Sequence, residues 1–395
     1  MNEIELIPEQ LAEEDNTENV LMTKGEIWFL KHFIKKYHPK KIVEVGFFAG
    51  GNTVNLLKWK DEDAQLFSID IATHWHKDIT KLSGWMADEI KEKKNFKIYR
   101  GYDYLDIYEE IGKDIDLIII DTVHTMPGEF FTFLAALPQL KDGCVVILHD
   151  IHLNMISFII DKYTPYNINA YCTGLLYGGV NSNIKWTVKS DSITNIGAFI
   201  IDKSTRNNIK DIFHILTTTW HSYPHELNLK EYSKYIDENY PKDCYNLFNT
   251  CLELQSTYFN HISKPAQNCR IDIVNSNNED NSVEILDVQD NVNISFPDWL
   301  KTNYGQGLMI ETELKSFDLT LKCIGNGRLS MILRGPNVRD HLGNHIPSYV
   351  NYYSFKVNGN DLTNKNINVW HDAPYFFEKN VENGEIIHIS VNWKN

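Results

Sequence analysis

The sequence predicts an α/β protein with a doubly wound, mostly parallel sheet, followed by helices and a C-terminal antiparallel β-sandwich. Between about residues 24 and 203, short apolar strands alternate with helical patterns, which is typical of a parallel sheet covered by helices. Beyond about residue 270, short alternating strands are separated by turn sequences such as "NGR" and "ENGE", which is typical of a sandwich. We therefore expect a first domain at residues 1–265 and a second at residues 266–395.

Each element of the first domain has its own signature. The segment "TKGEIWFLKHFIKKY" carries Ile27, Leu30, Phe33 and Ile34 at helical spacing, and Pro39 prevents its continuation. The expected strands are "KIVEVG", "AQLFSIDI", "FKIYRG", "DLIIID", "CVVILHD" and "NIGAFIIDK". The other expected helices are "NTVNLLKWK", "GWMADEIKEKK", "GEFFTFLAALPQL", "NNIKDIFHILTTTW" and "YNLFNTCLELQSTYF".

Composition narrows the class of protein. The 395 residues carry a formal net charge of -15, from 53 acidic and 38 basic residues, which disfavours a nucleic-acid partner. No stretch approaches the roughly 18 consecutive apolar residues of a membrane span, and the N-terminus lacks a signal-peptide pattern, so we expect a cytoplasmic protein. The six scattered cysteines form no C-x-x-C pair, which argues against a zinc knuckle or a disulfide framework.

Polar residues and glycines gather where the first two predicted strands end. Ligands of doubly wound sheets bind beyond the carboxyl ends of the strands. The first strand runs into "VEVGFFAGGNT", with Glu44, Gly46, Gly50 and Thr53. A glycine directly after a strand allows a tight turn and a close approach of the backbone to a ligand. The next strand ends at Asp70, a position where a carboxylate commonly accepts hydrogen bonds from a ribose.

Two later strands also end in titratable residues. In "DLIIIDTVHT" the strand is followed by Asp121 and His124, and "CVVILHD" ends with His149 and Asp150. An imidazole with an ordinary pKa near about 6.5 is a suitable general base, and a cation held by carboxylates lowers the pKa of a hydroxyl group and orients it. The alternatives are that Asp121 caps the following turn and that both histidines are structural.

Taken together, these residues resemble those of a class I S-adenosylmethionine-dependent methyltransferase, over about residues 24–203. The resemblance implies that S-adenosyl-L-methionine is the cofactor, with the glycine loop under its methionine part and an acidic residue on its ribose. The segment "RGYDYLD" matches the one that flanks the adenine in many members. The implied cofactor-binding residues are Glu44, Gly46, Gly50, Thr53, Asp70, Tyr102 and Asp103.

The motifs "DTVHT" and "HD" resemble those of methyltransferases related to cephalosporin biosynthesis and macrolide-sugar O-methylation. For the metal-dependent members, the resemblance implies Asp121, His149 and Asp150 as ligands of a divalent cation, Mg²⁺ or Mn²⁺, and His124 as the catalytic base. His149 departs from the family pattern, which has an acidic residue at this position. A His-Asp pair suits a softer metal than Mg²⁺, or no metal.

The second domain contains "LRGPNVRDHLGNHIPSYVNYYSFKVNG", followed by "NVWHDAPYFF". These segments resemble a β-rich module appended to bacterial enzymes of surface-polysaccharide synthesis. The resemblance implies a carbohydrate acceptor, and other polysaccharide-biosynthesis enzymes as partners. Aromatic rings that could stack on a sugar are Trp299, Tyr352, Trp370 and Tyr375; the alternative is that they fill the core of the sandwich.

The main hypothesis is therefore an O-methyltransferase acting on a carbohydrate or glycoconjugate hydroxyl in bacterial surface-polysaccharide biosynthesis. The first alternative is a non-catalytic glycan-binding or scaffold subunit with a degenerate methyltransferase fold. The second is an NAD-dependent sugar enzyme, which fits the position of Asp70 but not the spacing of the glycines. The sequence does not predict the acceptor, the methylated position or the oligomeric state.

Overall fold

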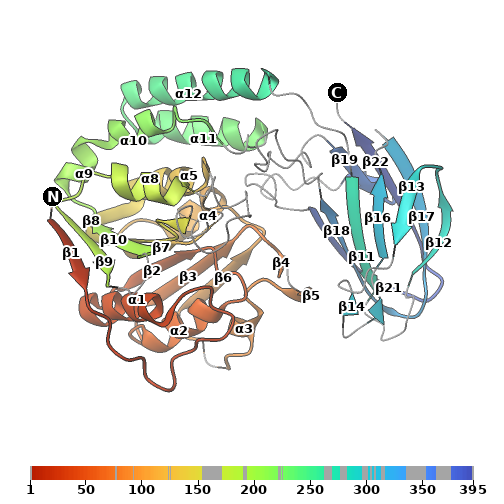
Figure 1. Ribbon diagram of the computed structural model, residues 1–395, viewed down its shortest axis with the longest axis horizontal. Coiled ribbons are helices and arrows are strands. Elements are labelled where there is room, and N and C mark those ends of the chain that lie inside the picture. Colours follow the sequence, from red (N-terminus) through yellow and green to blue (C-terminus); the bar gives the residue numbers. More distant parts are fainter. Residues whose placement is uncertain are drawn as a thin grey trace. The chain divides into compact units, whose positions relative to one another are not determined.

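The computed structural model divides the chain into two compact units (Figure 1). The first consists of Met1–Trp75 and Leu82–His261, and the second of His76–Lys81 and Ile262–Asn395. The sequence prediction places the boundary a few residues later, after residue 265. The structure describes residues 2–75, 78–91, 93–122, 124, 126–153, 171–189, 194–220, 224, 226–261, 269–275, 283–295, 301–302, 305–306, 308–312, 316–334, 353–361 and 375–393.

The first unit is built on an eight-stranded sheet with the order β1-β9-β10-β8-β7-β2-β3-β6. Its strands are β1 (Asn2–Leu6), β2 (Lys41–Val45), β3 (Gln65–Asp70), β6 (Phe96–Arg100), β7 (Ile115–Ile120), β8 (Leu140–His149), β9 (Ile184–Val188) and β10 (Ile196–Ile200). Only β10 runs antiparallel to its neighbours, β8 and β9. The predicted mostly parallel sheet is confirmed, while β1 and β9 were not predicted.

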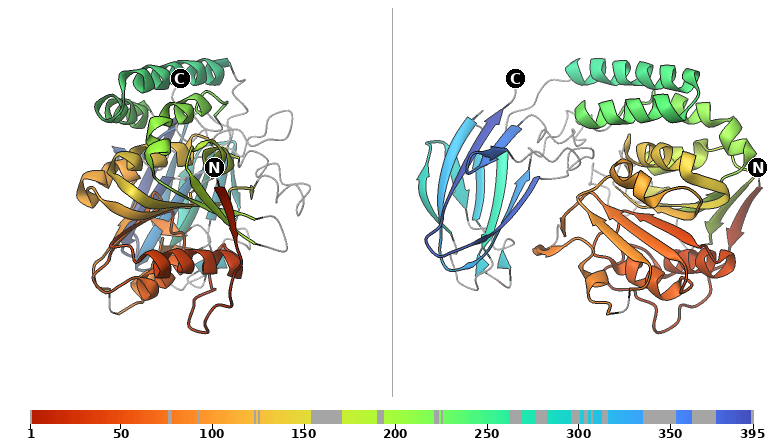
Figure 2. Two further views of the ribbon diagram at one scale, coloured as in Figure 1. Left: turned by 90° about the vertical axis from the view of Figure 1, so that its left-hand side faces the viewer. Right: turned by 180° about the vertical axis from the view of Figure 1, so that it is seen from behind.

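Helices cover both faces of this sheet (Figures 1 and 2). One face carries α1 (Lys24–Tyr37), α2 (Gly51–Trp59) and α3 (Trp85–Asp88), and the other carries α4 (Tyr104–Ile111), α5 (Gly128–Ala136) and α8 (Cys172–Gly179). Beyond these lie α9 (Lys203–Asn207), α10 (Ile209–Ile215), α11 (Glu226–Asn239) and α12 (Lys242–His261). The helix predicted over "GWMADEIKEKK" is wrong in length, because after Asp88 only Ile90 is apolar and no stripe remains to be buried.

Alternating side chains of the central strands fill both faces of the sheet. In β7, Leu117 and Ile119 belong to the core formed with α1 and α2. The intervening Ile118 and Ile120 point to the opposite face, as the two-residue period of a strand requires, and both are fully buried. The apolar run that precedes Asp121 is thus covered on both sides, so its polar residues are confined to the end of the strand.

The second unit contains two five-stranded antiparallel sheets, with the orders β13-β16-β11-β18-β21 and β12-β17-β22-β19-β20. One core draws on both sheets, for example Met331 from the first and Leu319 and Ile389 from the second, so the two antiparallel sheets share a hydrophobic core. The strands are β11 (Cys269–Asn275), β12 (Val283–Val288), β13 (Val292–Ser295), β16 (Leu308–Thr312), β17 (Ser316–Cys323), β18 (Gly327–Arg334), β19 (Tyr353–Val357), β20 (Asn360–Asp361), β21 (Tyr375–Val381) and β22 (Ile386–Trp393).

Two short two-stranded sheets complete the strands, β4 (His74–Trp75) with β5 (Asp78–Leu82) and β14 (Lys301–Thr302) with β15 (Gly305–Gln306).

Of the predicted sugar contacts, Trp299, Tyr352 and Trp370 lie outside the described residues, and for Tyr375 only the strand is described, not the side chain.

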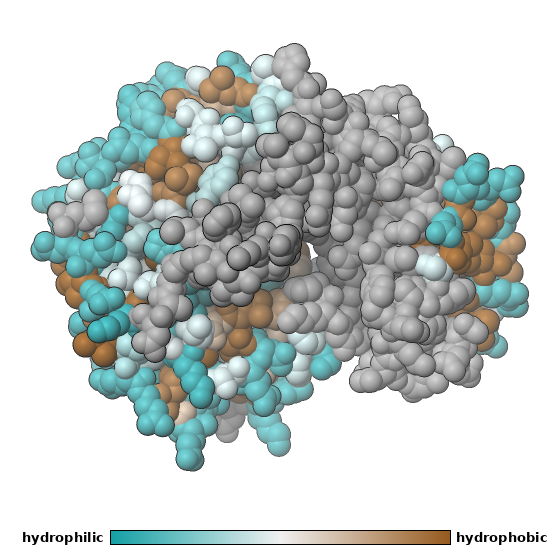
Figure 3. All heavy atoms as spheres, in the orientation of Figure 1, coloured by the Kyte–Doolittle hydropathy of each residue, from teal (hydrophilic) through white to brown (hydrophobic). Residues whose placement is uncertain are grey.

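On the face shown in Figure 3, the described residues of the first unit are hydrophilic with smaller groups of hydrophobic ones between them. Across the described ranges, every helix is too short or too polar to cross a lipid bilayer.

Hydrogen bonds fix the segment that leads into α1. Asp15 accepts from Trp59 Nε1 at 2.8 Å and forms an ion pair of 2.7 Å with Lys31. Thr23 and Glu26 then form a capping box, in which each side chain accepts from the other residue's backbone N–H. The start of α1 is thereby fixed, which matters because Glu26 belongs to the site described below.

The turn after β2 is pressed against the end of β7. Gly46 has a φ of 85°, and a Cβ at this position would lie 1.8 Å from the carbonyl oxygen of Asp121. The backbone N–H of Asp121 also donates to Val45 O at 2.9 Å. Glycine is therefore required here both by the backbone conformation and by the neighbouring strand.

Gly46→Ala is expected to lower the free energy of unfolding by at least about 3 kcal/mol, because it adds a backbone collision to the cost of a positive φ. Gly143→Ala is the matched control, since Gly143 has a φ of 88° but a Cβ added there would meet no atom within 4 Å. We expect this control to lose only about 1–2 kcal/mol. Thermal and urea unfolding measure both values, and equal losses would contradict the role given to Asp121.

Candidate active site

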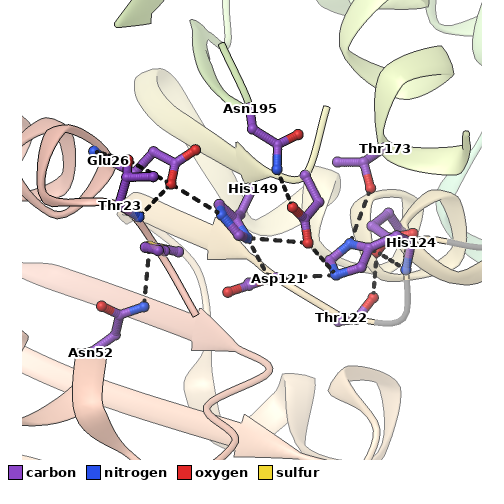
Figure 4. A network of polar contacts seen from close by, with 12 residues as sticks. Thr23, Glu26, Asn52, Asp121, Thr122, His124, His149, Thr173 and Asn195 are labelled. Atoms are coloured by element: carbon purple, nitrogen blue, oxygen red, sulfur yellow. Dashed lines mark hydrogen bonds and ion pairs between the residues drawn. The ribbon is translucent and has the colours of Figure 1, made fainter. Parts of the chain in front are cut away.

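Four of the predicted site residues converge at the carboxyl ends of β7 and β8 (Figure 4). These strands are parallel neighbours, with Ile120 paired to Leu148, so the residues that follow meet at one edge of the sheet. His149 Nδ1 lies 3.0 Å from Asp121 Oδ1, and His124 Nε2 lies 2.9 Å from Asp150 Oδ2. We call Asp121, His124, His149 and Asp150 the strand-end cluster.

Further polar residues surround the strand-end cluster, and sequence reasoning missed them. Glu129 on α5 accepts from the backbone N–H of His124 at 2.8 Å, and its Oε1 lies 3.3 Å from His124 Nδ1. Glu26 on α1 lies 3.8 Å from His149 Nε2. The side-chain amide of Asn195, just before β10, donates to Asp150 Oδ1.

Two of these three residues carried a detectable sequence signal. Glu129 is the only charged residue in "GEFFTFLAA", a helix whose other residues are apolar or small, and it is fully buried. A lone buried carboxylate requires a partner, which indicates a polar site nearby. Glu26 stands in the motif Thr-x-x-Glu, which predicts a helix cap but not the contact with His149. Nothing local distinguished Asn195.

The backbone is strained at two members of the cluster. His124 and Asp150 have φ angles of 62° and 63°, in the left-handed region that is uncommon for residues other than glycine. Such residues persist where surrounding contacts over-determine the conformation, and they concentrate at functional sites. The strain is consistent with a site whose geometry matters more than local stability.

Neighbouring carboxylates raise the pKa of both imidazoles of the cluster. Burial by itself lowers the pKa of His124, but the charges of Asp150 and Glu129 outweigh burial and raise this pKa to about 10. Burial likewise opposes protonation of His149, yet the charges of Asp121 and Asp150 raise its pKa well above the usual value. An imidazolium cannot accept a proton, so His124 has to lose its proton before it can act as a base.

The carboxylates of the cluster show the complementary effect. Burial raises the pKa of Asp150, while the charges of His124 and His149 lower it more strongly, to about 2. Burial also opposes ionisation of Glu129, but hydrogen bonds and charge from His124 hold its pKa below the usual range. Asp150 and Glu129 therefore favour the charged form of the imidazoles, and the imidazoles favour the charged form of these two carboxylates.

Three members of the cluster meet the geometric requirement of a cation site. Asp121, His124 and Asp150 each offer one ligand atom, and these atoms lie within 4.8 Å of one another. His149, predicted as a ligand in place of an acidic residue, faces the same two carboxylates, with Nδ1 3.4 Å from Asp150 Oδ2. His149 thus contacts both carboxylates, but it is not one of the three residues whose ligand atoms all lie within 4.8 Å of one another.

The predicted cofactor residue Asp70 lies at the end of β3, beside the turn after β2. Its Oδ2 accepts from the backbone N–H groups of Phe47 at 3.2 Å and Phe48 at 3.0 Å. Its Oδ1 accepts from the N–H of Ala72 at 2.8 Å. Burial raises the pKa of Asp70, although these hydrogen bonds lower it. Since a carboxylate oxygen has two lone pairs, Oδ1 can accept a second hydrogen bond.

Other predicted cofactor residues have contacts within the protein. Glu44 is 1% exposed and its carboxylate accepts from Thr53 Oγ1 at 2.7 Å and Ser68 Oγ at 2.6 Å. It therefore joins β2 to α2 and β3, and neither Glu44 nor Thr53 reaches the surface in this conformation. Contact between either side chain and a cofactor stays a prediction that would require the turn to move.

Tyr102 and Asp103 are neighbours at the start of α4, but their side chains have different surroundings. Asp103 is the N-cap of this helix and accepts from Tyr232 Oη on α11 at 2.6 Å. Tyr102 is 46% exposed, with its ring against that of Tyr99. Of these two, Tyr102 is the side chain placed where a ligand can reach it.

Comparison with known proteins identifies the class of the first unit. Residues 43–151, from β2 to the residue after Asp150, match a family model described as a methyltransferase domain. The chain therefore contains a methyltransferase domain. The predicted enzyme class, an S-adenosylmethionine-dependent methyltransferase, is confirmed.

More specific relatives are distant. No curated protein sequence matches the chain. The O-methyltransferase TomG of Streptomyces achromogenes, involved in tomaymycin synthesis and solved with SAM, is 15% identical, with a TM-score of 0.36 over 47% of this chain and 83% of its own. An O-methyltransferase from Bacillus cereus, solved with SAH, is 18% identical, with a TM-score of 0.36 over 47% of this chain and 84% of its own. Similarities this low do not carry a substrate to this chain.

The buried Glu44 predicts a distinct pH dependence of stability. Burial raises its pKa from 4.5 to about 7, although hydrogen bonds from Ser68 and Thr53 act in the opposite direction. A carboxyl group whose pKa is raised by folding destabilises the protein when ionised. Stability is therefore lost as the pH rises from about 4.5 to about 7, by up to about 3 kcal/mol.

Glu44→Gln is expected to remove this loss of stability. The side-chain amide oxygen can still accept the hydrogen bonds from Thr53 and Ser68, and the amide does not ionise. The variant should match the wild type near pH 4.5 and exceed it in stability at pH 8. Urea unfolding at four pH values between 4.5 and 8 measures the difference, and a difference that does not grow with pH would contradict the raised pKa.

Proposed function

We propose that the chain is an O-methyltransferase that transfers the methyl group of S-adenosyl-L-methionine to a hydroxyl of a carbohydrate or glycoconjugate, in the cytoplasm, during bacterial surface-polysaccharide biosynthesis. The observation that carries the proposal is the strand-end cluster, which lies at the same edge of the sheet as the glycine turn after β2. An acid-base and cation-binding group next to a methyl-donor site is what transfer to a weakly acidic oxygen requires.

The residues of the first two strand ends fit the cofactor. S-adenosylmethionine supplies an electrophilic methyl group on a sulfonium. The turn Gly46–Gly50 and Asp70 would hold it, with the remaining acceptor position of Asp70 Oδ1 available to a ribose hydroxyl. Tyr102 is an exposed ring at the neighbouring strand end. Glu44 and Thr53 connect β2 to α2 and β3 beside the turn, and Asp103 caps α4 directly after Tyr102.

The strand-end cluster would act on the acceptor oxygen. A divalent cation held by Asp121, His149 and Asp150 would supply positive charge that lowers the pKa of a hydroxyl group. His124 is the proposed base, and the charges of Asp150 and Glu129 set how readily it takes up a proton. Proximity and alignment with the methyl group contribute the remaining acceleration.

The proposal that the acceptor is a carbohydrate has fewer observations behind it. Its support is the resemblance of the C-terminal segments to modules of polysaccharide enzymes, together with an antiparallel two-sheet architecture. Partners among other polysaccharide-biosynthesis enzymes rest on the same resemblance.

Binding of the cofactor is tested by calorimetry on the full chain, with Mg²⁺, with Mn²⁺ and with EDTA. We expect S-adenosylmethionine to bind in the micromolar range and Asp70→Asn to weaken binding at least 10-fold, since a neutral amide is a poorer acceptor for a ribose hydroxyl. The control is Asp63→Asn, an exposed carboxylate whose partner is Lys40. Absence of binding under all conditions would favour the non-catalytic glycan-binding alternative.

His124→Ala is expected to lower turnover at least 100-fold while leaving the affinity for S-adenosylmethionine within two-fold, because general-base catalysis contributes about 10²–10⁴. Transfer of a labelled methyl group to a panel of monosaccharides and nucleotide sugars measures turnover. His214→Ala, at an exposed position of α10, is the control. Undiminished transfer by His124→Ala would exclude His124 from the chemistry.

A further inference from the structure

Glu129, in the first turn of α5, directs one carboxylate oxygen at the segment that leaves β7. Its Oε1 accepts from Thr122 Oγ1 at 2.8 Å and from the backbone N–H of His124 at 2.8 Å. The same oxygen lies 3.3 Å from Nδ1 of the His124 ring. One atom of Glu129 therefore faces both the backbone and the ring of the proposed base.

The helix that carries Glu129 fixes the position of this oxygen. All nine residues of α5 are buried, and Glu129 has no exposed surface. A negative charge in the first turn also interacts favourably with the positive end of a helix. Because α5 is held along its whole length, Glu129 can impose a position on the neighbouring segment instead of following it.

The backbone of His124 needs support of this kind. Its φ of 62° lies in the left-handed region, and such a conformation persists where surrounding contacts over-determine it. The N–H of His124 donates to Glu129, and its carbonyl oxygen accepts from the N–H of Cys172 at 3.1 Å. The Glu129 carboxylate is thus one of two contacts that hold this residue from either side.

The two nitrogens of the His124 ring have different surroundings. Nε2 lies 2.9 Å from Asp150 Oδ2, within the strand-end cluster, whereas Nδ1 lies toward Glu129 and is 3.4 Å from Thr173 Oγ1 (Figure 4). The hydrogen bond made by one ring nitrogen sets which of the two carries the hydrogen. An ionised carboxylate only accepts hydrogen bonds, so Nδ1 is the donor toward Glu129. Nε2 is then the nitrogen left to exchange a proton with an acceptor.

We infer that Glu129 is a positioning residue for the proposed base: it holds the backbone and the ring of His124 so that Nδ1 keeps its hydrogen and Nε2 faces the strand-end cluster. The inference rests on the proposed function, because Glu129 acts through His124. A base that follows a strand in a loop needs a support of this kind, since its ring is effective only in a narrow range of orientations.

Glu129→Gln and Glu129→Leu separate hydrogen bonding from the charge of the side chain. The amide oxygen of the glutamine is expected to take the place of Oε1, because an amide nitrogen there would face the N–H of His124. The glutamine should therefore keep the ring in place, whereas the leucine, of similar size, removes the acceptor. Gln139→Leu is the matched control, because Gln139 is buried and its described hydrogen bonds are with Tyr104 and Tyr108.

Turnover is measured with labelled S-adenosylmethionine and the same acceptor panel as for His124→Ala. We expect Glu129→Leu to lower kcat at least about 100-fold, as loss of an effective base does, with the affinity for S-adenosylmethionine within about two-fold. Glu129→Gln should stay within about 10-fold of the wild type, and Gln139→Leu should match it. Equal losses in both Glu129 variants, or a loss in Gln139→Leu as large as in Glu129→Leu, would overturn the inference. Undiminished turnover in His124→Ala would instead count against the proposed base itself.

The state of the ring is also measured without cofactor or acceptor, by nitrogen NMR of the isotope-labelled histidines in the full chain at neutral pH. The signals of His124 are identified by their absence from His124→Ala. We expect a hydrogen on Nδ1 in the wild type and in Glu129→Gln, and its loss in Glu129→Leu, where the hydroxyl of Thr173 can donate to Nδ1 instead. A hydrogen retained on Nδ1 in Glu129→Leu would overturn the inference. An Nδ1 without hydrogen in the wild type would do so even if Glu129→Leu does not fold, whether or not the chain transfers methyl groups.

Discussion

Two imidazole rings held between four carboxylates, at the ends of two apolar strands, form the interaction on which the geometry of this site depends. Asp121, Asp150, Glu129 and Glu26 are the carboxylates. Buried charges are tolerated only when they are paired and hydrogen-bonded. Removal of either ring would leave carboxylates without compensation, and so the cluster acts as one unit rather than as separate ion pairs.

The six side chains of this unit would carry the same formal charge with two extra protons as with one divalent cation. Four carboxylates and two protonated histidines sum to -2, and four carboxylates, two neutral histidines and one divalent cation also sum to -2. Exchange of two protons for one ion would therefore leave the net charge of these six side chains unchanged. The raised pKa values of His124 and His149 have the same physical cause, which is the negative charge of the surrounding carboxylates.

Sequence patterns predicted the strand-end residues because they depend on simple periodicity. An apolar strand buried on both faces places its polar residues at its end, and parallel neighbours bring these ends together, as β7 and β8 do. The supporting residues depend on tertiary contacts instead. Glu129 and Asn195 reach the cluster from a helix and from the start of a distant strand, so no local spacing connects them to it.

The missed and shortened elements have equally physical reasons. β1 has a mostly exposed side-chain pattern and is a strand because its backbone pairs with β9. Such pairing leaves little trace in hydrophobicity. The helix predicted after Gly84 stops after four residues, since helical propensity without an apolar stripe gains nothing from packing. Prediction thus succeeded where burial dictated the pattern and failed where backbone pairing or distant partners did.

The glycine turn after β2 shows that one motif can have two causes. Glycine spacing was interpreted as a cradle for a cofactor, yet Gly46 is already required by the carbonyl of Asp121, and a Cβ at Gly50 would lie 3.0 Å from the backbone of Gly84. The two causes are compatible and linked. Because the same turn contacts Asp70 on one side and Asp121 on the other, backbone packing fixes the distance between the proposed cofactor site and the strand-end cluster. Alignment of a methyl donor with an acceptor oxygen would then depend on the rigid sheet edge rather than on flexible side chains.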